Sequence, residues 1–104
     1  MAEFRVVPGS LLVTPSKTSF ASGEDVELRV KCQVQRKNGL GALVTWQSEY
    51  KFYDKNNTLL ASQTMVHTMA PWTDIDTENV EFTKKIGTFS PGLLEGYVAI
   101  SASG

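Results

Sequence analysis

The sequence contains very few of the side chains that bind metals through nitrogen or sulfur: Cys32 is the only cysteine and His67 the only histidine. A lone cysteine cannot form an internal disulfide, so the fold must be stabilised by packing. A structural zinc site needs a larger set of such ligands. We therefore expect no metal, and we interpret Cys32 as a buried hydrophobic residue and His67 as a residue on the surface of a strand.

An excess of charge of one sign is also absent. Ten basic and eleven acidic residues give the 104-residue chain a net charge of -1. Proteins that bind nucleic acids or anionic membranes usually carry a clear excess of positive charge. No apolar run approaches the length of about 18 residues that a membrane-spanning helix needs. The composition therefore predicts no nucleic-acid partner and no membrane insertion.

The motifs of the common enzyme classes are missing as well. A serine nucleophile needs a histidine base and an orienting carboxylate, and the chain has no nucleophile-elbow motif. Gly39 and Gly41 are not followed by the Lys-Ser/Thr pair of a phosphate-binding loop. We predict that the protein is not an enzyme and binds no cofactor.

Three acidic residues, Asp74, Asp76 and Glu78, are spaced by two in a polar segment. We interpret them as part of a solvated turn. The alternative is a Ca²⁺ site, because carboxylate oxygens in a loop suit a hard cation. The EF-hand pattern is not matched, since with Asp74 as first position Asn79 replaces the loop glycine and Lys85 the bidentate glutamate.

What the sequence does contain is alternation. From Val26 to Gln35 apolar and polar residues alternate strictly, and the same period of two recurs from Val44 to Tyr53. This period is typical of a strand with one buried and one exposed face in an antiparallel sheet. Ala21–Asp25, with a central glycine, and Asp54–Asn57 have the composition of turns.

Further strands are predicted around these two. Leu11–Thr14, bracketed by prolines, suits an edge strand, and Thr58–Thr68 continues the hairpin after the Asp54–Asn57 turn. The polar segment Met69–Asn79 is expected to be a long connection that crosses between sheets. Lys84 interrupts the next apolar pattern, which indicates a bulge or a sheet edge. After the Ser90-Pro91-Gly92 turn, Leu94, Val98 and Ile100 are expected to face inward from a closing strand.

These patterns predict one all-β domain over residues 1–104, an antiparallel sandwich of six or seven strands in two sheets, with residues 1–9 as a peripheral N-terminal segment. The residues expected to form its core are Val26, Leu28, Val30, Cys32, Val34, Val44, Trp46, Tyr50, Phe52, Val80, Phe82, Ile86, Val98 and Ile100.

Four local patterns follow one another along the chain: Phe20–Leu28, Trp46, Phe52–Asp54 with its asparagines, and Ser90–Tyr97. Together they resemble the immunoglobulin-like and fibronectin type III-like β-sandwich superfamily, in which Tyr97 would correspond to the corner tyrosine. Two departures are visible. The second cysteine of an inter-sheet disulfide is absent, and too few residues follow Ile100 for the usual last strand. Either Glu3–Val7 helps to close that edge, or a strand from another chain does.

The resemblance implies a non-catalytic structural or adhesive module that binds other protein subunits, including further copies of itself through a strand or sheet edge. The alternative is a carbohydrate-binding module of β-sandwich type. Trp72, in a polar connection, is the main candidate for partner contact, together with Tyr53 and Phe4.

Residues Met1–Val7 lack the apolar core of a secretory signal. Either the numbering begins after a removed signal, with Met1 added artificially, or the protein is made and used without Sec export. The compartment stays open; a virion component, such as a capsid decoration or tail protein, or a surface component is the setting we favour.

Overall fold

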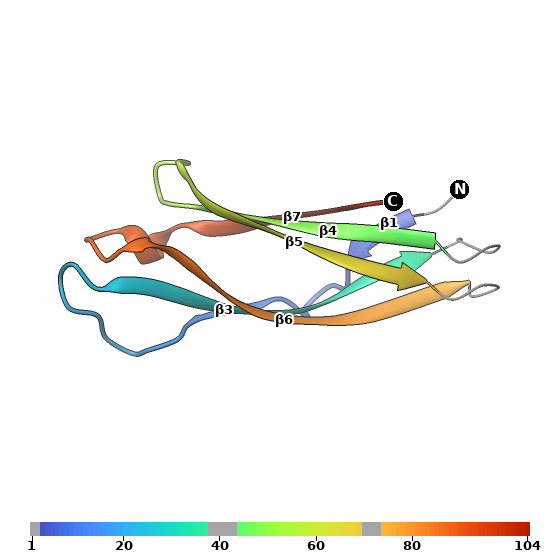
Figure 1. Ribbon diagram of the computed structural model, residues 1–104, viewed down its shortest axis with the longest axis horizontal. Helices are drawn as coiled ribbons and strands as arrows, with labels where there is room; N and C mark the ends of the chain where they lie inside the picture. Colours follow the sequence, from blue (N-terminus) through green and yellow to red (C-terminus); the bar gives the residue numbers. More distant parts are fainter. Residues whose placement is uncertain (1–2, 38–43, 70–73) are drawn as a thin grey trace.

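The computed structural model describes residues 3–37, 44–69 and 74–104, except for the side chains of Val44 and Met69. The described chain forms seven β-strands and one short 3-10 helix (Figure 1). In chain order these are β1 (Glu3–Val6), β2 (Leu12–Pro15), β3 (Asp25–Lys37), β4 (Val44–Tyr53), β5 (Leu59–Met69), β6 (Ile75–Thr88), η1 (Leu93–Glu95) and β7 (Tyr97–Ser103).

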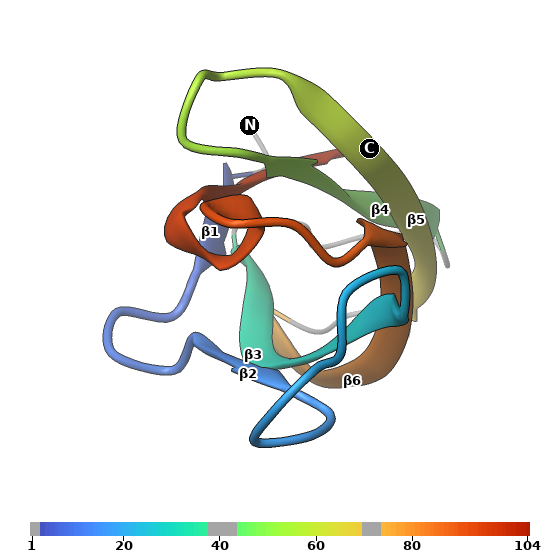
Figure 2. The same cartoon turned by 90° about the vertical axis from the view of Figure 1, so that its left-hand side faces the viewer.

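The strands form two antiparallel sheets. In the first, β3 is central: β6 pairs along its whole length on one side, while β1 and β2 share the other, β1 against Val34–Lys37 and β2 against Leu28–Lys31. The second sheet has the order β5-β4-β7. The two sheets lie face to face, with β5 beside β6 (Figure 2). The predicted fold class, an all-β antiparallel sandwich of two sheets, is confirmed.

The core lies where the alternation places it. Most of the predicted core side chains are buried, and Leu28, Phe82, Val98 and Ile100 are partly buried and pack against them. The structure does not describe the side chain of Val44. The predicted residues that are buried are Val26, Val30, Cys32, Val34, Trp46, Tyr50, Phe52, Val80 and Ile86.

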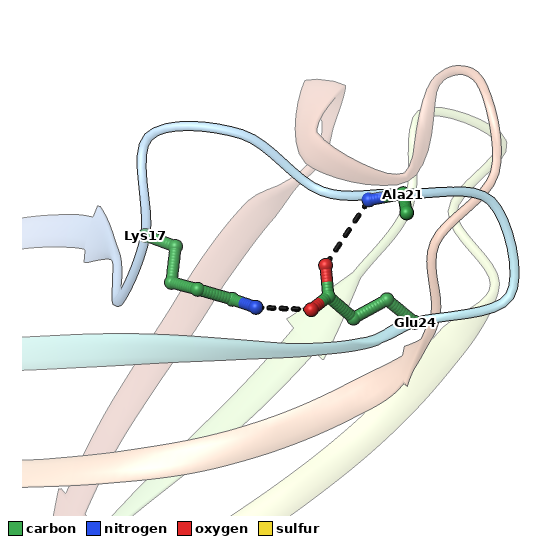
Figure 3. Close-up of polar contacts among 3 residues, drawn as sticks. All are labelled: Lys17, Ala21 and Glu24. Carbon is green, nitrogen blue, oxygen red and sulfur yellow. Dashed lines mark hydrogen bonds and ion pairs between the residues drawn. The ribbon is translucent and has the colours of Figure 1, made fainter.

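The turn between β2 and β3 forms as its composition predicts. Gly23 has a positive φ of 84°, and the Glu24 amide donates to the Ala21 carbonyl at 3.1 Å. The Glu24 carboxylate accepts hydrogen bonds from the Ala21 amide and the Lys17 ammonium (Figure 3). The bond from Lys17 lowers the pKa of Glu24. After this turn the chain reverses direction, and β3 runs back antiparallel to β2.

The segment Met69–Asn79 differs from its prediction. The chain does pass from one sheet to the other here, but β5 extends to Met69 and β6 begins at Ile75, so most of the expected loop is strand. Cross-strand bonds explain the difference: the side-chain amides of Gln33 and Gln35 donate to Asn79 and Thr77 at 3.0 and 2.9 Å. Polar residues on the outer face of a sheet thus extend β6 without any apolar signal.

The irregularities near Lys84 agree in part with prediction. Lys84 lies on β6, which is an edge strand, and its ammonium donates to the Gln63 side chain of β5 at 3.3 Å. The bulge itself falls two residues later, where Ile86 is the extra residue opposite the Val26–Glu27 step. Lys84 therefore lies where β6 meets the second sheet.

Within the segment predicted to be peripheral, Glu3–Val6 forms β1 and is part of the sheet. β1 pairs with the end of β3, and the ring of Phe4 lies 5.6 Å from that of Trp46. Gly104 is so near Phe4 that a Cβ there would lie 2.7 Å from the ring. β1 thus lies beside the end of β7 and covers the space between the sheets there, although the two strands do not pair. In the described residues, no helix is long and apolar enough to cross a membrane.

Candidate functional site

The clearest candidate site is an apolar cavity between the edges of the two sheets, which we call the β2–β7 groove. Its volume is about 230 Å³. It lies beyond the part of the interior that β1 covers, towards the end of the molecule where η1 and the Asp54–Asn57 turn are found. Side chains from both sheets and from η1 line it, among them Leu11, Val13, Leu28, Phe52, Leu93 and Val98.

Two glycines around η1 shape one wall of the β2–β7 groove. Gly92 has a φ of 87°, which an L side chain rarely adopts, and η1 begins directly after it. Gly96 lies against β4 so closely that a Cβ would be 1.7 Å from the Tyr53 carbonyl oxygen. Leu93 is therefore buried and Leu94 is exposed, the reverse of what the sequence predicts for Leu94.

Apolar side chains are exposed around the opening of the groove. Leu11 and Leu94 line it and are 41% and 42% exposed. Exposed leucines are ordinary when they occur singly. Here two lie at the opening of one apolar cavity, an arrangement typical of interaction sites.

Over Tyr97–Ser101 the adjacent edge of β7 has none of the usual protection against strand pairing. One side of β7 pairs with β4, and no described strand pairs with the other. Natural sheet edges are usually protected by charge, proline, a bulge or a covering element. β7, with the sequence YVAISAS, contains neither charge nor proline. Among the other described edges, β6 is charged, β2 contains Pro15, β1 contains Glu3 and Arg5, and β5 lies against β6.

Tyr53 and Tyr97 lie at the end of the groove. Their rings stack with centroids 5.1 Å apart, and the Tyr97 hydroxyl donates to the Asn57 side chain at 2.8 Å. Tyr97 is 51% exposed and bonds a side chain. A corner tyrosine of the immunoglobulin-like superfamily bonds its hydroxyl to backbone, whereas the Tyr97 hydroxyl bonds a side chain.

Of the three predicted partner-contact residues, the two that the structure describes, Tyr53 and Phe4, are not brought together. Tyr53 lines the groove, whereas Phe4 packs on Trp46 at the other end of β4. Trp72 lies outside the described residues. Met69, the last described residue before it, pairs with Val44, at the opposite end of β4 from Tyr53.

A second group of polar side chains lies inside the covered end of the sandwich, and we call it the buried polar chain. The Ser48 hydroxyl is hydrogen-bonded to His67 Nε2 and to the Tyr50 hydroxyl, both at 2.8 Å. The Tyr50 hydroxyl in turn lies 3.7 Å from Cys32 Sγ. Prediction placed His67 on the surface, but it is only 7% exposed, because it pairs with Trp46 on the inner face of β4 and β5.

Burial sets the protonation of the side chains in the buried polar chain. It lowers the pKa of His67, and the charge of Asp76 acts in the opposite direction, so the imidazole is neutral at neutral pH. It raises the pKa of Cys32 and of Tyr50, so thiol and phenol keep their protons. Ser48 is fully buried, and no substrate can approach its hydroxyl in this conformation. The arrangement links β4 to β5 within one sheet and, through Cys32, to β3 of the other sheet.

Of the three acidic residues, Asp76 and Glu78 interact with each other on β6, and Asp74 lies before the strand. Asp76 and Glu78 are half-buried on β6, with the buried Arg36 opposite Asp76 in the β3–β6 pairing, whereas Asp74 is exposed before the strand. Burial, and secondarily Asp76, raises the pKa of Glu78. Within ranges 3–37, 44–69 and 74–104 no group of three His, Cys, Asp or Glu residues is placed to hold a metal ion. The interpretation of Asp76 and Glu78 as turn residues is wrong, and the Ca²⁺ alternative gains no support.

The sequence pattern did not predict the groove. Among the described residues, one side of β7 is unpaired and β1 lies beside its end without pairing. No protein-family model matches the chain, and no curated protein or solved structure matches it at a significant level.

Proposed function

We propose that this protein is a non-catalytic structural or adhesive module that binds other protein subunits by strand addition along β7. The observation that carries the proposal is the combination of an uncharged, unpaired strand edge with an apolar groove beside it. An added strand would form backbone hydrogen bonds with β7 and place alternate side chains in the groove.

The dimensions of the groove fit this mode of binding. A cavity of about 150 Å³ holds a benzene-sized group. The β2–β7 groove, at about 230 Å³, has room for one or two apolar side chains of an added strand. Val98 and Ile100 face inward from β7, so side chains beside them on a neighbouring strand would also face inward. Assemblies of repeated small subunits, such as virions or surface structures, are the setting that we propose.

The carbohydrate-binding alternative has less support. It would use Trp72, which lies outside the described residues, together with Tyr53. The ring of Tyr53 is stacked against Tyr97, which leaves less of its face for a sugar.

Peptide titration with NMR detection tests the proposal. The probe is a synthetic Lys-Val-Thr-Val-Thr-Val-Lys peptide, and its control has aspartate in place of each valine. We expect the valine peptide to shift the backbone amide signals of Tyr97–Ser101 and of β2, and the control to leave them unchanged.

Two results would overturn this function. One is the absence of shifts on β7 with the valine peptide. The other is a saturable shift of Tyr53 or Trp72 signals with cello-, xylo- or manno-oligosaccharides while β7 stays unchanged, which would support the carbohydrate-binding alternative.

A further inference from the structure

We propose that the strand added at β7 is β7 of a second copy of this chain, paired antiparallel about a two-fold axis. This inference rests on the proposed function and specifies its partner. The result would be a continuous sheet across two copies, with the order β5-β4-β7-β7-β4-β5.

The side chains of β7 suit pairing with themselves. A two-fold axis brings each patch against its own copy, so a charged strand would place like charges opposite one another. The exposed residues on the outer face of β7 are Tyr97, Ala99, Ser101 and Ser103, none of which is charged. In contrast, the outer face of β6 carries Glu81 and Lys85.

The same axis would bring the open sides of two sandwiches together. In each copy β1, β2 and β7 are the edge strands on that side. The grooves of the two copies would open towards the interface, and the exposed side chain of Leu11, which lines the groove, would lie on that side.

The extent of pairing follows from the position of β1. Phe4 lies against Gly104, so β1 occupies the space beside the last residues of β7. The accessible edge is therefore Tyr97–Ser101, and an axis through its centre places Ala99 opposite Ala99 of the second copy. Ala99 and Ser101 point away from the core, so both can be changed without altering the interior.

Charge exchange on β7 tests the proposal. In Ala99→Lys/Ser101→Lys, cations of the two copies would oppose each other, and in Ala99→Glu/Ser101→Glu, anions would. Lys51 is the β4 partner of residue 99 and Glu49 that of residue 101, so each double variant makes one favourable and one unfavourable pair within its own sheet. The two variants are thus matched in their intramolecular cost.

Sedimentation velocity over a wide range of concentration provides the measurement. We expect the unmodified chain to dimerise and each double variant to have a dimer dissociation constant at least about tenfold higher. An equimolar mixture of the two variants should regain a mixed dimer. The control Ser62→Lys/Thr64→Lys changes two exposed residues of β5 and should dimerise normally. Circular dichroism confirms that each variant is folded.

Three outcomes would overturn the second-copy proposal: an unmodified chain that stays monomeric, a lysine variant that dimerises normally, or a β5 control that is equally impaired. The peptide titration separates the two proposals. A monomeric chain whose β7 amides still respond to the valine peptide overturns the second copy and leaves strand addition intact. A monomer without that response overturns both.

Discussion

The two ends of the sandwich interior are built in opposite ways. At the end near the termini, β1 covers the space between the sheets, and the interior contains the polar side chains of Ser48 and His67 beside Trp46. At the other end the interior is apolar, and the β2–β7 groove leaves it open to solvent. The covered end thus buries polar groups, and the open end exposes apolar ones.

This difference shows which end contributes stability and which is available for binding. A buried polar group is costly unless it is hydrogen-bonded, so the covered end has to keep a single well-defined arrangement. An exposed apolar surface gains free energy when a partner covers it. We therefore expect substitutions at the covered end to reduce stability, and substitutions at the open end to reduce association.

The largest effect should come from Trp46→Ala. Trp46 is buried and its ring contacts those of Phe4 and His67, so truncation leaves a large cavity and should lower the free energy of unfolding by about 3–5 kcal/mol. Urea-induced unfolding measures the loss. The exposed Val66→Ala on β5 is the control and should change stability by less than about 0.5 kcal/mol. A loss below about 1 kcal/mol for Trp46→Ala would contradict its place in the core.

Ser48→Ala should have the next largest effect. It removes the shared partner of His67 Nε2 and the Tyr50 hydroxyl and leaves both groups in a buried site, which we expect to cost about 1–3 kcal/mol. Chemical unfolding of Ser48→Ala beside the exposed Ser62→Ala measures this cost. Equal stability of the two variants would show that the buried polar chain does not stabilise the covered end.

The covered end should also make stability depend on pH. Because burial lowers the pKa of His67 below 6.5, the unfolded chain takes up a proton at a higher pH than the folded protein. Between the two pKa values the unfolded state binds more protons than the folded state. The contribution of His67 to the free energy of unfolding is therefore complete above pH 6.5 and decreases as the pH falls towards the folded pKa. Unfolding measured between about pH 7.5 and about pH 5.5 should show the decrease.

The variant His67→Gln provides the control for this dependence. It lacks the titrating group, so its stability should vary less over the same interval.

Glu78, whose pKa is raised from 4.5 by burial, acts in the opposite sense, because its contribution to the free energy of unfolding is lost as the pH rises through its folded pKa. An identical pH profile for His67→Gln and the unmodified chain would refute the assignment to His67.

The smallest effect on stability is expected at the open end. Leu11→Ser changes a side chain that is already exposed, so the free energy of unfolding should change by less than about 0.5 kcal/mol. Binding of the valine peptide should nevertheless weaken, because Leu11 lines the groove. Leu59→Ser, at a similarly exposed position on β5, should leave binding unchanged. Equal effects of the two variants on binding would remove the distinction between the groove and other exposed apolar residues.

How far the sequence predicts the structure depends on whether each strand has a clear inner face. β3 alternates strictly, and its inward residues are buried or partly buried as expected. In β5 the adjacent Met65 and Val66 are both apolar, so the pattern does not show which face is buried. The structure places Met65 inside and Val66 outside, and His67 therefore faces the interior.

Two other features depend on tertiary packing. Leu93 and Leu94 are adjacent, and the pattern does not determine which one is buried. Leu93 is the buried one because η1 begins directly after Gly92 and ends where Gly96 lies against the Tyr53 carbonyl. The groove arises where edges of two sheets stay apart, and no local pattern describes the distance between edges.

β3 and β6 form the longest ladder of the protein, yet β4 and β5 separate them along the chain. During synthesis on a ribosome, β3 emerges well before β6 and has no partner along that edge until most of the chain has been made. The β4–β5 hairpin can form earlier through its own turn. Completion of the first sheet is therefore expected to wait for almost the whole polypeptide, as is usual when distant segments must pair.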